Sequence, residues 1–78
     1  MVDATALRVG LEASGLSVIE LWIRYFGLGG TRTPSDLRSY LDGRDTVMTM
    51  GQHDIIVHAL NERLVEVDPE RAVPYARA

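Results

Sequence analysis

The segment from Leu16 to Gly30 constrains the fold more than any other part of the chain, because it predicts a helix with both ends marked. Ser17 and Glu20 have the Ser-x-x-Glu spacing of a capping box, and the glycines that close the segment favour termination of a helix. Between these ends only a narrow polar strip, which holds Glu20 and Arg24, interrupts the apolar residues. A helix over 17–27 with so little polar surface must be covered by other elements or by another chain.

Three further helices are predicted, over residues 3–14, 34–42 and 49–67. Apolar residues recur at helical spacing in each of them. Thr33 before Pro34 marks the start of the short one, and Thr49 and Gln52 have capping-box spacing at the start of the long one. A proline at position 69 ends the last helix, so the remaining residues, 69–78, are expected to form a short extended tail.

Short loops favour neighbouring helices that pack against each other. The sequence therefore predicts an all-α fold, a compact bundle of about four helices in a single domain over 1–78, with the helix at 17–27 at its centre. A chain of this length buries only about 60% of its unfolded surface. Because 46% of the residues are apolar, we expect part of the apolar surface to be buried between copies of the chain, in a homo-oligomer such as a dimer.

Charge and composition exclude several classes of function. The net charge is −3 and the acidic and basic residues are interleaved, so no basic stripe is present to bind nucleic acid or an anionic membrane. The chain has no cysteine, which excludes disulfides, thiolate metal sites and a cysteine nucleophile. There is neither a long apolar run typical of a membrane span nor a signal-peptide pattern, and we expect a cytoplasmic protein.

Three patterns resemble functional sites but are better explained by structure. The glycine-rich segment 27–31 follows a helix instead of a strand and lacks the Gly-Lys-Ser/Thr of a phosphate loop. His53 and His58 are five residues apart, which splays them around a helix and away from a shared metal. No serine lies in a nucleophile elbow. The sequence therefore predicts no enzyme activity, cofactor, metal site or small-molecule ligand.

Without reaction chemistry, the surplus of apolar surface favours a non-enzymatic helical interaction module. We expect a regulatory adaptor that binds a protein partner or a second copy of itself. Arginine and aromatic side chains often anchor protein interfaces, and a polar patch covers part of the last predicted helix. On these grounds the expected partner-binding residues are Arg24, Tyr40, Asn61 and Arg63.

The alternative is a small DNA-binding transcriptional regulator that uses the turn and helix at 29–43. This unit and the residue after it carry Arg32, Arg38 and Arg44. Three aspartates in the same stretch balance these charges, which makes DNA the less favoured partner.

Four blocks occur in order along the chain: Glu-Leu-Trp-Ile-Arg-Tyr-Phe-Gly-Leu-Gly-Gly at 20–30, Ser-Tyr-Leu-Asp-Gly at 39–43, His-Ala-Leu-Asn-Glu-Arg at 58–63 and Val-Pro-Tyr at 73–75. Together they resemble a group of small single-domain actinobacterial proteins. The resemblance covers nearly the whole chain from Leu16 onward. It implies an independent domain from a high-GC bacterium with an association to regulation, and it brings no functional residues.

Overall fold

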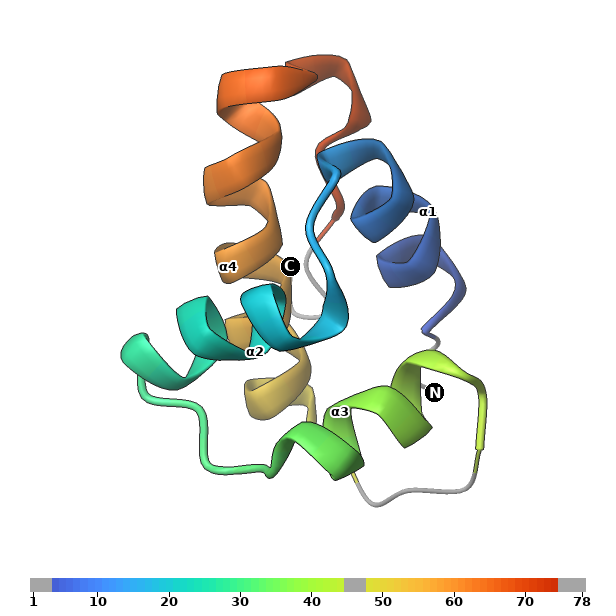
Figure 1. Cartoon of the computed structure of the whole chain (residues 1–78), viewed down its shortest axis with the longest axis vertical. Helices are drawn as coiled ribbons and strands as arrows, with labels where there is room; N and C mark the ends of the chain where they lie inside the picture. The colour runs from blue at the N-terminus through green and yellow to red at the C-terminus, as the bar shows by residue number, and fades with distance from the viewer. Residues whose placement is uncertain (1–3, 45–47, 75–78) are drawn as a thin grey trace.

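Four α-helices and one 3-10 turn make up the part of the chain that the computed structural model describes, residues 4–44 and 48–74. The helices are α1 (Thr5–Ser14), α2 (Val18–Gly27), α3 (Pro34–Leu41) and α4 (Met50–Val67), and the turn is η1 (Pro69–Arg71). They pack into a compact all-α bundle (Figure 1), which confirms the predicted fold class. Each helix begins and ends within two residues of its predicted range. The predicted first helical residue, Asp3, lies outside the described residues.

Local side-chain signals set the helix starts. The Ser17 hydroxyl accepts a hydrogen bond from the Glu20 amide at 3.2 Å, and the Glu20 carboxylate accepts one from the Ser17 amide at 2.9 Å. Thr33 and Asp36 form the same reciprocal pair at the start of α3. Both pairs satisfy amides that a helix leaves without an internal partner, so they fix where α2 and α3 begin.

The central helix is α4, and not α2 as predicted. In Figure 1, α4 runs along one side of the bundle, α1 packs against it and α2 crosses it, while α3 closes one end against α1 and α2. With 18 residues, α4 is long enough to contact both α1 and α2, whereas α2 has 10. Within this bundle α2 buries only Leu21 and Tyr25. The prediction failed because helix length, and not apolar content, determined which helix packs most extensively against the others.

All four helices contribute to the core. Its fully buried side chains are Leu7, Leu21, Tyr25, Leu37, Ile56, Val57, Ala59, Leu60 and Leu64. Gly10 lies where α1 meets this core, and a Cβ there would lie 2.9 Å from Leu60 Cδ2 and 2.6 Å from Val73 Cγ2. Glycine at this position lets α1 approach α4 closely, which offsets its low helix propensity.

The segment after α4 is not extended from its start, because Pro69–Arg71 form η1. Proline has the φ that the first position of such a turn requires, and the Arg71 amide donates a hydrogen bond to the Asp68 carbonyl at 3.0 Å. The chain then runs back between α1 and α4 (Figure 1), where Val73 is buried. The remaining residues of the predicted tail, 75–78, lie outside the described part of the chain.

Candidate interaction surface

One face of α2 exposes apolar side chains to solvent. Ile19, Ile23 and Phe26 have exposed fractions of 50%, 60% and 59%, and Trp22 beside them is partly buried. The four positions follow the i, i+3, i+4, i+7 spacing that places side chains in one row along a helix. We call this row, formed by Ile19, Trp22, Ile23 and Phe26, the α2 stripe.

The α2 stripe exists because α2 is apolar on two faces and the fold covers one of them. Leu21 and Tyr25 are buried, and α2 packs against α3 and α4. The sequence predicted that Trp22, Tyr25 and Phe26 would all be covered by other elements or by another chain. Within the described residues only Tyr25 is fully buried. The uncovered face is therefore a surface that another molecule can bury.

Intramolecular contacts hold the Trp22 ring in place. It stacks on the Phe26 ring, with 5.1 Å between the centroids and 23° between the planes. Its Nε1 atom donates a hydrogen bond to the Arg32 carbonyl at 2.9 Å. The polar atom of the indole is thus satisfied and the ring is oriented before any partner binds, which lowers the entropy cost of association.

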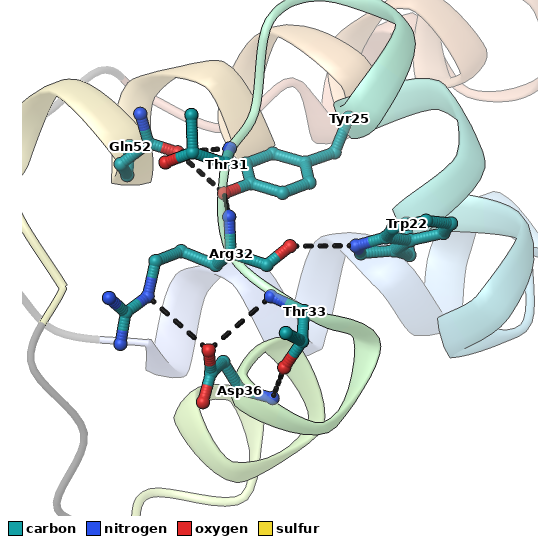
Figure 2. A network of polar contacts seen from close by, with 7 residues as sticks. All are labelled: Trp22, Tyr25, Thr31, Arg32, Thr33, Asp36 and Gln52. Carbon is teal, nitrogen blue, oxygen red and sulfur yellow. Dashed lines mark hydrogen bonds and ion pairs between the residues drawn. The ribbon is translucent and has the colours of Figure 1, made fainter.

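The loop between α2 and α3 is fastened to α2 and α4 by a polar network (Figure 2). The Tyr25 hydroxyl donates a hydrogen bond to Gln52 Oε1 at 2.5 Å and accepts one from the Arg32 amide at 2.9 Å. The Thr31 amide donates to the same Gln52 oxygen at 3.0 Å. Because Trp22 also binds this loop, the network supports one edge of the α2 stripe.

Gln52 was predicted to complete a capping box with Thr49, and only half of that box forms. The Thr49 hydroxyl accepts a hydrogen bond from the Gln52 amide at 3.1 Å, as predicted. The Gln52 side chain is used instead by Tyr25 and Thr31. Sequence reasoning missed this role because these partners are 27 and 21 residues away, and no local spacing records such a contact.

The amides of the glycine-rich segment are used within the chain, which leaves none to bind a phosphate. The Gly29 amide donates to the Phe26 carbonyl at 3.1 Å, and the Gly30 amide donates to the Tyr25 carbonyl at 3.0 Å. With φ of +98° at Gly29, this is the Schellman pattern of a helix end. The next three amides, at 31–33, donate to side chains of the loop network.

Three of the four predicted partner-binding residues make contacts inside the chain. Tyr40 is buried and its hydroxyl is hydrogen-bonded with His53 Nδ1 at 2.7 Å, so it makes these contacts within the fold, and its partner-binding role stays a prediction. Asn61 holds the C-terminal segment by exchanging two hydrogen bonds with the Val73 backbone, at 2.9 and 2.8 Å. Arg63 donates from Nε to the Ser14 carbonyl at 3.2 Å. These three residues serve packing between elements.

Arg24 is the fourth predicted partner-binding residue, and around the helix surface it lies between Glu20 and the buried Leu21, outside the α2 stripe. The i, i+4 spacing of Glu20 and Arg24 allows an ion pair, but none joins the two in the described part of the chain. The Glu20 carboxylate binds the Ser17 amide instead. This hydrogen bond, followed by the one with the Ser17 hydroxyl, lowers the pKa of Glu20, and Arg63 and Arg24 contribute less.

Outside the α2 stripe, the described residues form few candidate binding sites. Among the described residues, no three histidine, aspartate or glutamate side chains are placed to hold a metal ion, and no helix is long and apolar enough to span a membrane. Two shallow grooves border α1, and no histidine is among the described residues that line them. In the predicted DNA-binding unit, Arg32 lies 3.6 Å from the Asp36 carboxylate, while Arg38 and Arg44 are exposed.

Comparison of the chain with protein-family models, with curated proteins and with solved structures found no match. The resemblance to small actinobacterial proteins stays a prediction. Any functional conclusion must therefore come from the surface itself.

Proposed function

We propose that the protein is a non-enzymatic helical interaction module, a regulatory adaptor of the cytoplasm that binds protein surfaces, its own copy included, through the α2 stripe. The observation that carries this proposal is the exposure of Ile19, Ile23 and Phe26 by half or more on one face of a helix. Complete burial of a large apolar side chain contributes about 1.5–3 kcal/mol. Three half-exposed side chains supply roughly a few kcal/mol, which fits weak and reversible association.

The composition of the α2 stripe supports a binding role. Protein interfaces have apolar and aromatic centres with charged residues at the rim. The stripe places a stacked Trp22–Phe26 pair beside isoleucines, and Glu20 is the charged residue of α2 nearest to it around the helix surface. A held tryptophan is also among the side chains that contribute most to binding energy.

Sedimentation velocity over a range from about 1 μM to about 1 mM tests this proposal. We expect the mass of the wild type to rise with concentration, and Ile23→Lys to stay a monomer because it places a charge within the stripe. Val65→Lys is the matched control, since Val65 is 66% exposed on α4, outside the stripe. A wild type that remains a monomer throughout, or an equal effect of both variants, would contradict the proposal.

The DNA-binding alternative has support only from the exposed Arg38 and Arg44. Arg32, the third arginine of that unit, is paired with Asp36 in its own helix start. Phosphate contacts strengthen steeply as salt is removed. An electrophoretic shift of duplex DNA at about 50 mM salt would favour a DNA-binding regulator over the interaction module.

A further inference from the structure

We propose that residues 72–74 form a releasable strap, and that the site beneath it binds an extended segment of a partner protein in which a valine precedes a proline. We call the residues that hold the strap, Gly10, Leu60, Asn61 and Leu64, the strap site. It belongs to α1 and α4 and shares no residue with the α2 stripe, so this inference goes beyond the proposed function and is independent of it.

A single side chain binds the strap backbone. The Asn61 side-chain nitrogen donates a hydrogen bond to the Val73 carbonyl at 2.9 Å, and the Asn61 side-chain oxygen accepts one from the Val73 amide at 2.8 Å. One amide group thus satisfies both backbone polar groups of one residue, as a neighbouring strand does in an antiparallel sheet. This pair of hydrogen bonds recognises an extended main chain.

Pro74 favours the backbone conformation that Asn61 binds. A proline disfavours the helical conformation in the residue before it and shifts that residue toward the extended region. In an extended residue the N–H and the C=O point to the same side of the chain, where one amide group can reach both. A valine that precedes a proline is therefore preorganised for the strap site, which lowers the entropy cost of binding.

The Val73 side chain fits beside a glycine. It is 5% exposed, whereas its two neighbours in the strap are exposed. A Cβ at Gly10 would lie 2.6 Å from Val73 Cγ2. The same Cβ would lie 2.9 Å from Leu60 Cδ2 and 3.5 Å from Leu64 Cδ1. The strap site thus holds a branched side chain of valine size against the backbone of α1 and two leucines of α4.

Few contacts hold the strap in place. Among the described residues, its hydrogen bonds to the four helices are the two with Asn61, and its one buried side chain is Val73. The helices α1 and α4 also pack directly against each other, so their contact does not require the strap. Segments with few buried apolar contacts open separately from the rest of a fold. We therefore expect the strap to leave its site while the four helices stay folded.

An open strap site has the features needed to bind an extended segment of another protein. Opening uncovers Leu60 and Leu64, and it frees the donor and the acceptor of Asn61. A partner segment with a valine before a proline restores the contacts that the strap made. The strap competes with this partner at an effective concentration of about millimolar or higher, because it belongs to the same chain. Release of the strap therefore controls access to the site.

Native-state hydrogen exchange of the wild type tests the release. We expect the Val73 amide to exchange at least 100-fold faster than the Leu60 amide, after correction for intrinsic rates. Its rate should stay constant in urea below the unfolding transition, because a small opening exposes little surface. Asn61→Ala should raise the Val73 rate at least 10-fold. Val65→Ala, an exposed position on the same helix, is the matched control and should leave it unchanged.

Binding of a peptide tests the strap site itself. The probe is the pentapeptide Ala-Ala-Val-Pro-Ala, acetylated and amidated, and the matched control peptide has glycine in place of valine. Val73→Asp in the full chain releases the strap, because it places a charge against two leucines, and it leaves Asn61 intact. In NMR titrations we expect the probe to shift the Asn61 side-chain signals and to bind Val73→Asp at least 10-fold more tightly than the wild type. The glycine peptide should bind at least 10-fold more weakly than the probe.

Three results would overturn the proposal. The first is exchange of Val73 and Leu60 through one opening with the same urea dependence. The second is a Val73→Asp chain whose circular dichroism shows loss of the helices, since the helices are expected to stay folded without the strap. The third is equal binding of the two peptides, or no shift of the Asn61 signals at about 10 mM probe. Sedimentation of the wild type tests the α2 stripe separately, so either proposal can fail alone.

Discussion

Both the ring and the hydroxyl of Tyr25 make contacts inside the fold. Its ring is buried in the core, and its hydroxyl donates to Gln52 and accepts from the Arg32 amide. The ring also occupies the space next to Gly30, where a Cβ would come within 2.3 Å of it. Tyr25 therefore connects α2, α4 and the loop before α3. Substitutions of the residues that contact it are expected to change the stability of the fold.

Gly30→Ala is expected to destabilise the fold by roughly 1–3 kcal/mol, because the buried Tyr25 ring has little freedom to move away from the new methyl group. Gly27→Ala is the matched control in the same segment. A Cβ at Gly27 meets nothing within 4 Å, and alanine favours helix, so a gain of about 0.4–1 kcal/mol is expected. Urea unfolding measures both changes. Equal stability of the two variants would show that the ring and loop rearrange freely.

Gln52→Ala is expected to cost roughly 1–3 kcal/mol, because the Tyr25 hydroxyl and the Thr31 amide lose a shared acceptor. Gln52→Glu should remain close to the wild type, since a carboxylate accepts both hydrogen bonds and suits the N-terminus of α4. Thermal unfolding at neutral pH distinguishes the two. Similar losses in both variants would mean that the amide group itself, and not an acceptor oxygen, is required.

At this scale the sequence revealed the capping residues but not the network. Ser17 and Glu20 lie three positions apart, as do Thr33 and Asp36, so local spacing is sufficient to predict these caps. The second role of Gln52 depends on how α2 crosses α4, which no local pattern encodes. The hydrogen bond between Tyr40 and His53 leaves no local pattern either, since His53 lies on another helix.

At the scale of elements, α2 combines a precise start and end with two apolar faces. Its bounds were predictable because the capping box and the glycine-rich end act locally. Its place in the bundle was not predictable, because a helix that is apolar on two faces fits equally well at a centre or at an interface. The described structure covers the Leu21–Tyr25 face and leaves the α2 stripe exposed.

The start of α2 is expected to respond to pH. Since the hydrogen bonds with Ser17 lower the pKa of Glu20 in the folded protein, the ionised carboxylate stabilises the fold at pH values above the pKa of the unfolded chain. This contribution is lost as the pH falls through the lower pKa of the folded state. NMR titration should show the Glu20 carboxyl and the Ser17 amide proton changing with one midpoint, below the ordinary range for glutamate. A normal midpoint for Glu20, or an unresponsive Ser17 amide, would exclude the effect.

At the scale of the whole molecule, α4 organises the core and α2 exposes an apolar stripe on the surface. The all-α class followed from periodicity and short loops, and helix length decided which element became central. The surplus of apolar surface was predicted from composition, and the structure shows where on α2 part of it is exposed. Of the four predicted partner-binding residues, only Arg24 lies on α2.

Substitutions on the exposed face and on the buried face of α2 are expected to affect self-association and folding stability separately. Ile23→Lys should change the unfolding free energy of the monomer by no more than about 0.5 kcal/mol, because the side chain is exposed. Leu21→Ala, two residues earlier on the buried face, should cost about 2–5 kcal/mol. Chemical unfolding at low protein concentration measures both. A large loss in Ile23→Lys would mean that the stripe is part of the monomer core.

Trp22 is the sole tryptophan of the chain, and its position gives the protein a built-in fluorophore. The indole is part of the α2 stripe and donates a hydrogen bond to the loop carbonyl of Arg32. Detachment of the loop is expected to shift its emission to the red at any dilution, whereas the proposed self-association is expected to shift it to the blue only as the solution is concentrated. Intrinsic tryptophan fluorescence can therefore follow both equilibria without a label.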